Sequence, residues 1–211
     1  MICGDSSTAE QPTLQLEDGG AIPTSPLHIR KIGHTEAKNL VRQFHYLGDT
    51  KFLHKERFGL YRDGLLVGAA IYGGLSAPET AVSAFGLPRG NYPELLELHR
   101  LVLSPDTNGE NCGSYLLGRS LRQLKKDGYR AVVSYADIEL HVGFIYQATN
   151  FTYHGLTTKK CDFFIDGIKQ SRGTTRGKSG EWRPRNQKHR YVYLLDKTLT
   201  VKWPQKEFPK K

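Results

Sequence analysis

Cysteines are few in this sequence, and long apolar runs and a leader-like start are absent. The three cysteines, Cys3, Cys112 and Cys161, are widely spaced and form no CxxC pair. This spacing favours reduced thiols over a disulfide framework or a zinc site. No apolar stretch approaches the roughly 20 residues that a membrane helix needs. The N-terminus has neither a basic start nor an apolar segment, so we expect no secretory signal and a location in a reducing cytoplasm.

The formal net charge of +9 is spread unevenly over the 211 residues. Residues 1–26 contain acidic side chains but no Lys or Arg, and they are rich in Ser, Thr, Gly and Pro. This composition predicts a disordered tail. Residues 169–190, "KQSRGTTRGKSGEWRPRNQKHR", have eight Lys or Arg against the single acid Glu181. Glycines interrupt this segment, so we expect a mobile loop rather than a basic helix.

This basic loop, residues 169–190, has two interpretations. It is either a solvated charged segment or a nucleic-acid contact. Lys and Arg neutralise phosphates, and Trp182 within the run could stack on a base or wedge beside one. The second interpretation predicts binding to double-stranded DNA. Its candidate residues are Arg172, Arg176, Lys178, Trp182, Arg183, Arg185 and Lys188.

The order of apolar patterns predicts an α/β (α+β) fold, with a mixed central sheet and helices on both faces. Asp63-Gly64 is a strong hairpin signal between two strands. A loop containing Pro78, Pro88 and Pro93 follows. The long helix near residue 120 places Leu117, Leu121 and Leu124 on one stripe. We expect strands near 27–33, 57–62, 65–74, 95–104, 130–137, 151–157 and 189–197, and helices near 34–48, 112–128 and 141–150.

An apolar strand at 131–133 ends in the polar sequence Tyr135-Ala136-Asp137, and Tyr146 follows one short helix later. Open α/β sheets bind ligands beyond the carboxyl ends of their strands. We therefore expect Tyr135 and Asp137 to lie at a reaction site, with Tyr146 facing it. Asp137 could accept a proton, and Tyr146 could protonate a leaving group. The alternative for Tyr146 is plain core packing.

The strand at 95–104 contains several polar residues. Simple alternation puts Glu97 and His99 on one face with Leu101 and Leu103, and Arg100 on the other. Glu97 could serve as a general base, or both residues could face solvent. Arg100 is a cation in an apolar strand, so it should pair with a carboxylate or face a ligand.

His45 and Tyr46 lie where the first helix should end. His45 could interact there with the helix dipole. Both residues could instead belong to an active site.

The order of elements, closed by Asn150-Phe151, resembles the Gcn5-related N-acetyltransferase (GNAT) fold. The YxxxGF close of that family falls on 146–151, with Asn150 in place of glycine. Its phosphate-binding pattern, (Q/R)xxGx(G/A), falls on "NGENCG" at 108–113, where only Gly113 matches. The resemblance implies an acyl-CoA-like donor at the helix start, with Arg100, Gly113 and Ser114 as candidate donor-binding residues. The alternative is a helix-capping loop.

Four motifs together resemble the Mom family of bacteriophages. They are "HYLG" at 45–48, "HRLVL" at 99–103, "SYAD" with "GxxYxxxNF" at 134–151, and "KHRYVYLLDK" at 188–197. Proteins of that family convert adenine in phage DNA to an N6-carbamoylmethyl form, which blocks host restriction. The resemblance implies a DNA-modifying transferase in the cytoplasm of a bacterial host. Its domain would span 27–198 and precede a basic tail at 199–211. The implied catalytic residues are His45, Tyr46, Glu97, Asp137 and Tyr146.

The resemblance also points to ferrous iron, which a set of two histidines and one carboxylate would suit. The sequence assigns no ligands, and His45 and Asp137 are the available candidates. Two other functions stay open: a GNAT acyltransferase that moves an acyl group from coenzyme A to a small amine, and a non-catalytic DNA-binding decoy. The oligomeric state is also open, a homodimer included.

Overall fold

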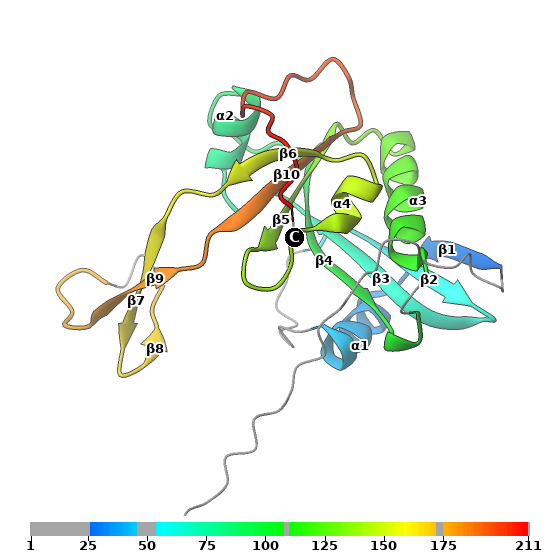
Figure 1. Cartoon of the computed structure of the whole chain (residues 1–211), viewed down its shortest axis with the longest axis horizontal. Coiled ribbons are helices and arrows are strands. Elements are labelled where there is room, and N and C mark those ends of the chain that lie inside the picture. The colour runs from blue at the N-terminus through cyan, green and yellow to red at the C-terminus, as the bar shows by residue number, and fades with distance from the viewer. Residues whose placement is uncertain (1–25, 46–53, 108–109, 172–174, 211) are drawn as a thin grey trace, which may run out of the picture.

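A computed structural model describes residues 26–45, 54–107, 110–171 and 175–210. In these ranges, seven strands form one sheet in the order β1-β2-β3-β4-β5-β10-β6 (Figure 1). Its strands are β1 Leu27–Lys31, β2 Glu56–Arg62, β3 Leu65–Gly73, β4 Leu95–Leu103, β5 Ala131–Asp137, β6 Thr152–Leu156 and β10 Lys188–Leu194. The helices are α1 His34–Phe44, α2 Glu79–Phe85, α3 Cys112–Lys126 and α4 Phe144–Ala148, with a 3-10 turn at Pro105–Thr107. The expected mixed α/β fold is confirmed.

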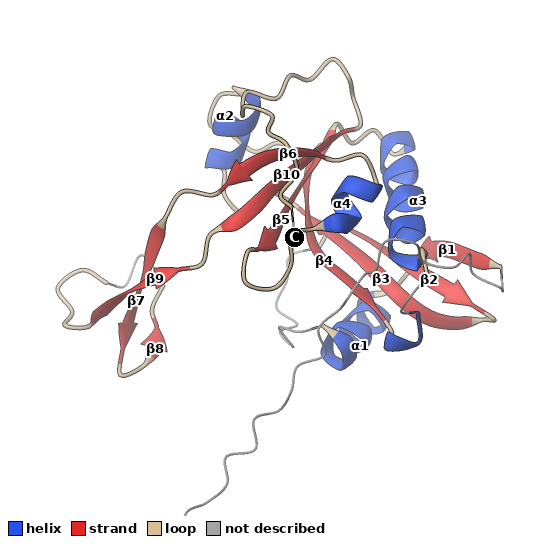
Figure 2. Ribbon diagram, in the orientation of Figure 1, coloured by secondary structure: helices blue, strands red, loops and turns tan. Residues whose placement is uncertain are grey.

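The helices cover the sheet in two pairs (Figure 2). Side chains alternate between the faces of a strand, so neighbouring residues belong to different layers. Ile71 packs with α1, whereas the adjacent Tyr72 packs with α3. Leu95 packs with α2, whereas Leu96 packs with α3. One face of the sheet is therefore covered by α1 and α2, and the other by α3 and α4.

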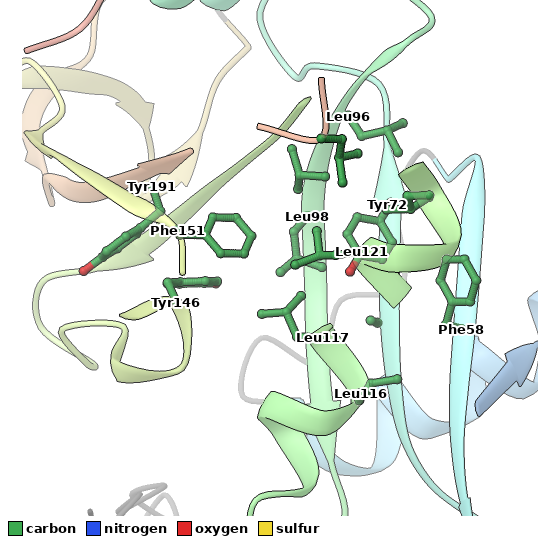
Figure 3. Packing of buried hydrophobic residues seen from close by; sticks show 14 of the residues in the cluster. Phe58, Tyr72, Leu96, Leu98, Leu116, Leu117, Leu121, Tyr146, Phe151 and Tyr191 are labelled. Carbon is green, nitrogen blue, oxygen red and sulfur yellow. The ribbon is translucent and has the colours of Figure 1, made fainter. Parts of the chain in front are cut away.

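The main core lies under α3 and α4 (Figure 3). Leu117, Leu121 and Leu124 are buried there, which confirms the predicted helical stripe. Tyr146, Phe151 and Tyr191 form an aromatic group beside them. Burying a large apolar side chain stabilises the fold by about 1.5–3 kcal/mol.

Two turns define the ends of elements in the first half of the chain. Asp63 and Gly64 have φ of 49° and 78°, the backbone that a two-residue hairpin requires, so the predicted turn is confirmed. The proline-containing segment was expected to be a loop, but it includes α2. Pro78 precedes this short helix, and Gly86 ends it with a left-handed φ of 66°.

Three further strands form an arm, defined as residues 160–185, that projects from the ends of β6 and β10 (Figure 1). They are β7 Lys160–Ile165, β8 Ile168–Lys169 and β9 Glu181–Arg185. The basic run at 169–190 was predicted to be a loop, and this prediction is wrong for its strand residues. β9 pairs with β7, and Trp182 packs on Phe163 with ring centroids 5.0 Å apart.

The C-terminal segment that was expected to be a tail packs on the domain. Leu199 is buried with α2, and Phe208 packs on the opposite face against Tyr153. Lys206 donates its backbone N–H to the Tyr153 carbonyl at 2.8 Å, along the outer edge of β6. This segment therefore covers the edge strand, whose unpaired groups would otherwise invite pairing with another chain. None of the helices in the described ranges has the length and apolar composition needed to span a bilayer.

Candidate functional site

The centre of the sheet opens between its two parallel strands. β4 and β5 pair only where Leu95–Glu97 face Ala131–Val133. Beyond these positions, β4 continues to Leu103 and β5 to Asp137 without pairing to each other. We call the space between these unpaired ends the notch. It lies at the carboxyl ends of the strands, where open α/β sheets bind ligands.

A β-bulge in β4 decides which side chains face the notch. Ile71 pairs with Arg100, but the next residue of β3, Tyr72, pairs with Leu98, so His99 is an extra residue. The His99 ring contacts the Gly74 carbonyl at 3.0 Å. Paired residues share a face, so Arg100 lies on the α1/α2 face together with Glu97. The simple alternation expected from sequence is therefore wrong beyond Leu98.

Polar side chains from β4 and β5 line the α1/α2 face. Glu97 accepts hydrogen bonds from the backbone N–H and the hydroxyl of Ser76, both at 2.9 Å. The Tyr135 hydroxyl lies 3.5 Å from that of Thr80. Burial raises the pKa of Tyr135; the Thr80 contact opposes this rise, and the Glu97 charge adds to it. The phenol is therefore protonated at neutral pH and can donate a hydrogen bond.

Asp137 lies at the tip of β5 on the same face as Tyr135. Its Oδ1 accepts the Glu139 N–H at 3.2 Å, and its carbonyl accepts two further N–H groups of the following turn. Oδ2 accepts no hydrogen bond from the residues that the structure describes. Asp137 thus orders its own turn and keeps one carboxylate oxygen for another donor.

His45 ends α1 near Arg100 and His141. Burial, reinforced by the charges of Arg100 and His141, lowers the pKa of His45 to about 4. Partial burial also lowers the pKa of His141, and Asp137 opposes that shift. Both imidazoles are therefore largely neutral at pH 7. Tyr46, the second residue of the expected pair, lies outside the described residues.

Tyr146 lies on the other face of the sheet. It is buried, with its ring 4.7 Å from that of Tyr191 and 5.3 Å from that of Phe151 (Figure 3). Tyr135 packs instead with the residues around α2. The expectation that Tyr146 faces Tyr135 and Asp137 from the same side is therefore wrong. The two groups lie on opposite faces of the sheet, because α4, which carries Tyr146, packs on the α3 side.

A groove of about 490 Å³ runs along α3 on the Tyr146 side. Its lining includes Asn111, Ser114, Arg122 and Asn150. The first turn of α3 has no side-chain cap, so its N–H groups suit an anionic ligand. The Ser114 hydroxyl donates to the Asn111 carbonyl at 3.0 Å. These features fit the phosphates of an acyl-CoA-like donor.

Gly113 serves packing rather than exposure of the backbone. It is buried, and a Cβ there would lie 2.5 Å from the Ile145 side chain on α4. Glu110, just before α3, forms an ion pair with Arg62 and accepts a hydrogen bond from the Cys112 thiol. This pairing neutralises a carboxylate that would otherwise repel an anion at the helix start.

No group of three or more His, Cys, Asp or Glu side chains in the described ranges is arranged to hold a metal ion. The two candidate iron ligands, His45 and Asp137, are therefore not part of such a group there. The structure assigns no metal ligand.

The arm contains most of the candidate DNA-binding residues. Trp182 is 61% exposed. Arg183 pairs with Glu181 at 2.8 Å, and Arg185 pairs with Asp162, which also binds Lys169 at 2.6 Å. The remaining candidates differ in their surroundings. Arg176 and Lys178 are exposed and make no ion pair with a described residue, Lys188 is exposed at the root of the arm opposite Asp137, and Arg172 lies outside the described residues.

Sequence reasoning missed Arg190 and His189. Arg190 lies opposite Tyr135 in β10, stacks over Trp203 at 4.4 Å and donates to the His154 carbonyl at 2.7 Å. His189 contacts the Tyr153 hydroxyl at 2.8 Å. A charged residue in an otherwise apolar strand was the available signal. This signal is masked in the sequence because Arg190 is also the last residue of the basic segment 169–190.

The order of elements and the mixed sheet match the GNAT fold. Three solved structures match with a TM-score of 0.51 each: an N-acetyltransferase from Staphylococcus aureus, an IAA acetyltransferase from Bacillus cereus, and yncA from Salmonella typhimurium with its cofactor acetyl-CoA. They are 16%, 12% and 15% identical to this chain, and the matches cover 82%, 80% and 82% of it and 100%, 99% and 96% of theirs. At such identities the likeness shows the fold.

The model of the Mom protein family matches residues 26–210, so the chain belongs to that family. No curated protein matches the chain.

Proposed function

We propose that the chain is a DNA-modifying transferase that attaches a carbamoylmethyl group to N6 of adenine in double-stranded DNA and so protects the DNA from restriction. Family membership supports this function, and one feature of the geometry carries it. The polar side chains at the notch are divided between two faces of the sheet. An acceptor can therefore enter from one face while a donor enters from the other.

The acceptor face has the groups that an amine acceptor needs. Asp137 offers a carboxylate oxygen at the strand tip, and Glu97 offers a second carboxylate on the neighbouring strand. The protonated Tyr135 phenol can bind a ring nitrogen or a carbonyl. The N6 amine is a weak nucleophile because its lone pair is delocalised into the purine ring. Removal of its proton by Asp137 as it attacks would contribute about 10²–10⁴-fold to the rate.

The reaction forms a bond from N6 to the transferred carbon and breaks the bond from that carbon to its leaving group. The proton of N6 passes to Asp137, and the leaving group takes the electron pair. Tyr146 lies on the donor face, where its hydroxyl could protonate that group. The N6–CH2 bond of a carbamoylmethyl group requires a donor that is activated at its methylene carbon, because attack on a thioester carbonyl would leave an N6-acyl group instead. An acyl-CoA-like donor, when bound, would supply this carbon only if it is activated there, and the start of α3 with Ser114 would hold its anionic part on the donor face. Arg100 lies on the acceptor face with Glu97.

The target amine is paired inside the double helix, so the adenine must leave the stack. The arm projects from the ends of β6 and β10, and β10 begins beside the β5 tip at the notch (Figure 1). It presents Trp182 with exposed cations. Contacts from Arg176, Lys178 and Lys188 to phosphates would offset part of the cost of extrusion. This is the observation that favours DNA over a small amine as the acceptor.

The test is nucleoside mass spectrometry of DNA from cells that express the chain. We expect a modified deoxyadenosine whose mass increase matches the carbamoylmethyl group. The variant Asp137→Asn should lose most of this product. Asp63→Asn is its matched control, because it makes the same chemical change in a hairpin turn where Asn is well accommodated. Absence of any modified nucleoside, with DNA binding intact, would favour a non-catalytic decoy.

The groove along α3 favours a second candidate, acyl transfer from coenzyme A to a small amine. It predicts thiol release from acetyl-CoA in the presence of simple amines and without DNA. The first candidate predicts that DNA is required. Measuring thiol release with and without duplex DNA separates the two.

A further inference from the structure

The turn that follows β5, residues 138–142, presents two large apolar side chains to solvent. Ile138 is 40% exposed and Leu140 is 42% exposed. Exposed aliphatic groups are common singly, but here two lie within three residues, directly after Asp137 at the tip of the notch. Packing covers only part of each side chain and leaves the rest to solvent.

The backbone of this turn is held firmly at both ends. The Asp137 carbonyl accepts the N–H groups of Leu140 and His141, each at 3.1 Å, and the Gln187 carbonyl accepts that of Ile138 at 3.3 Å. At the other end, the Tyr191 hydroxyl donates to the Val142 carbonyl. Little ordering would therefore be needed when the turn meets a partner.

A left-handed glycine fixes the exit of the turn. Gly143 has a φ of 75°, and a Cβ there would lie 2.7 Å from Tyr146 and 3.0 Å from Tyr191. The turn is thus packed against the aromatic group of the core and cannot shift freely. The exposed side chains of Ile138 and Leu140 project from a rigid support.

The charges around the turn indicate which part of a duplex it meets. Lys188 is exposed and pairs in register with Asp137, so a cation lies at the base of the turn. Glu139, between the two aliphatic residues, is exposed and would be repelled by phosphates. Phosphate contact is therefore favoured at Lys188, and the apolar tip is better placed among bases.

We infer that Ile138 and Leu140 form a wedge that enters the base stack of duplex DNA and fills the gap left by the extruded adenine. This inference rests on the proposed function and gives that site its means of extruding the base. Apolar side chains inserted between base steps unstack them, and unstacking costs a few kcal/mol per step. A wedge fixed beside Asp137 would stabilise the open duplex at the place where the target base is needed.

The test compares the parent with the double variant Ile138→Ala/Leu140→Ala on two substrates. One is a paired duplex that the parent modifies, and the other is the same duplex with the target adenine mispaired. A mispaired base is already easier to extrude. We expect the variant to lose about tenfold or more of its yield on the paired duplex, a loss that corresponds to about 1.4 kcal/mol. On the mispaired duplex, where extrusion costs less, its yield should recover to within about threefold of the parent.

Leu65→Ala is the matched control, because Leu65 is 70% exposed at the hairpin between β2 and β3. It should leave the yield on both substrates unchanged, and all variants should melt within a few degrees of the parent. No loss on the paired duplex overturns the wedge. Equal loss on both substrates overturns it too, because the turn would then act in chemistry or in general docking.

Failure of the proposed function is distinguishable from failure of the wedge. If the parent modifies no DNA, the proposed function fails, and the wedge is judged on extrusion alone. The probe is then a duplex containing 2-aminopurine, whose fluorescence rises when it leaves the stack. A rise with the parent that is lost with the double variant supports the wedge, and no rise with the parent overturns it.

Discussion

Charged residues are brought together from distant strands in the central sheet, but from neighbouring positions in the arm. At the notch, Glu97, Arg100 and Asp137 come from β4 and β5, which lie far apart in the chain, and they are partly buried. In the arm, Arg183 pairs with Glu181 two residues away, and Asp162 joins two cations of the same small sheet. The basic run therefore contains two kinds of cation. Some hold the arm together, and those near its tip are available to a partner.

We expect the largest effect from a substitution at the notch. Asp137→Asn keeps the shape of the side chain and its hydrogen bond to Glu139, but removes the proton acceptor. We expect the yield of modified deoxyadenosine to fall by about 10²–10⁴-fold while DNA affinity stays the same. Mass spectrometry and a filter-binding assay measure the two quantities. An unchanged yield would place the reaction elsewhere.

The arm predicts an effect on binding instead. The double variant Arg176→Ala/Lys178→Ala removes two cations that have no carboxylate partner among the described residues. We expect weaker binding to every duplex sequence, and a salt slope smaller by about 1.8, since each phosphate contact contributes about 0.9. Binding titrations over a range of salt concentrations measure it.

The double variant Arg183→Ala/Arg185→Ala tests the two arginines that are paired within the arm. It should also weaken binding and flatten the salt dependence, but it should loosen the arm as well, because both arginines are paired within it. If neither double variant changes affinity at low or high salt, the arm is not the DNA-binding element.

A smaller effect is expected on the local stability of the arm. The Arg185 guanidinium, together with Lys169, holds the pKa of Asp162 well below its usual range. Asp162→Ala removes the partner of both cations, which are partly exposed, so we expect the arm to open more readily by up to about 1 kcal/mol. Hydrogen exchange should rise in 160–185 and stay unchanged in α3. A loss of protection throughout the domain would show that the arm does not open independently.

The same carboxylate makes the arm sensitive to acid. Its folded pKa lies below the unfolded value of about 4, so its contribution is present above that pH and is lost as the pH falls below it.

The last prediction concerns the pH dependence of stability through His45. Its folded pKa of about 4 lies below the unfolded value of about 6.5, so the unfolded chain takes up a proton first as the pH falls. Stability should therefore decrease between about pH 6.5 and 4 and be independent of this group above that window. His45→Gln should reduce the decrease in melting temperature over that range. An identical pH profile for parent and variant would contradict the assignment.

Much of the fold was predictable because it depends on local patterns. The Asp63-Gly64 turn needs positive φ at both positions, and the stripe of Leu117, Leu121 and Leu124 requires only helical spacing. The helix α2 was missed because its few residues lie among prolines. The arm was missed because Phe163 and Trp182 are far apart in sequence and form their contact only after β7 and β9 pair.

The sequence by itself determined the mixed α/β fold, the family resemblance and the presence of polar residues at the ends of two central strands. Only the tertiary structure decided which of them meet. The extra residue at His99 brings Arg100 onto the face of Glu97, and the packing of α4 beside α3 puts Tyr146 across the sheet from Tyr135. The physical reason is that a single bulge reverses the side-chain alternation of a strand, and no local pattern in the sequence marks where the bulge falls.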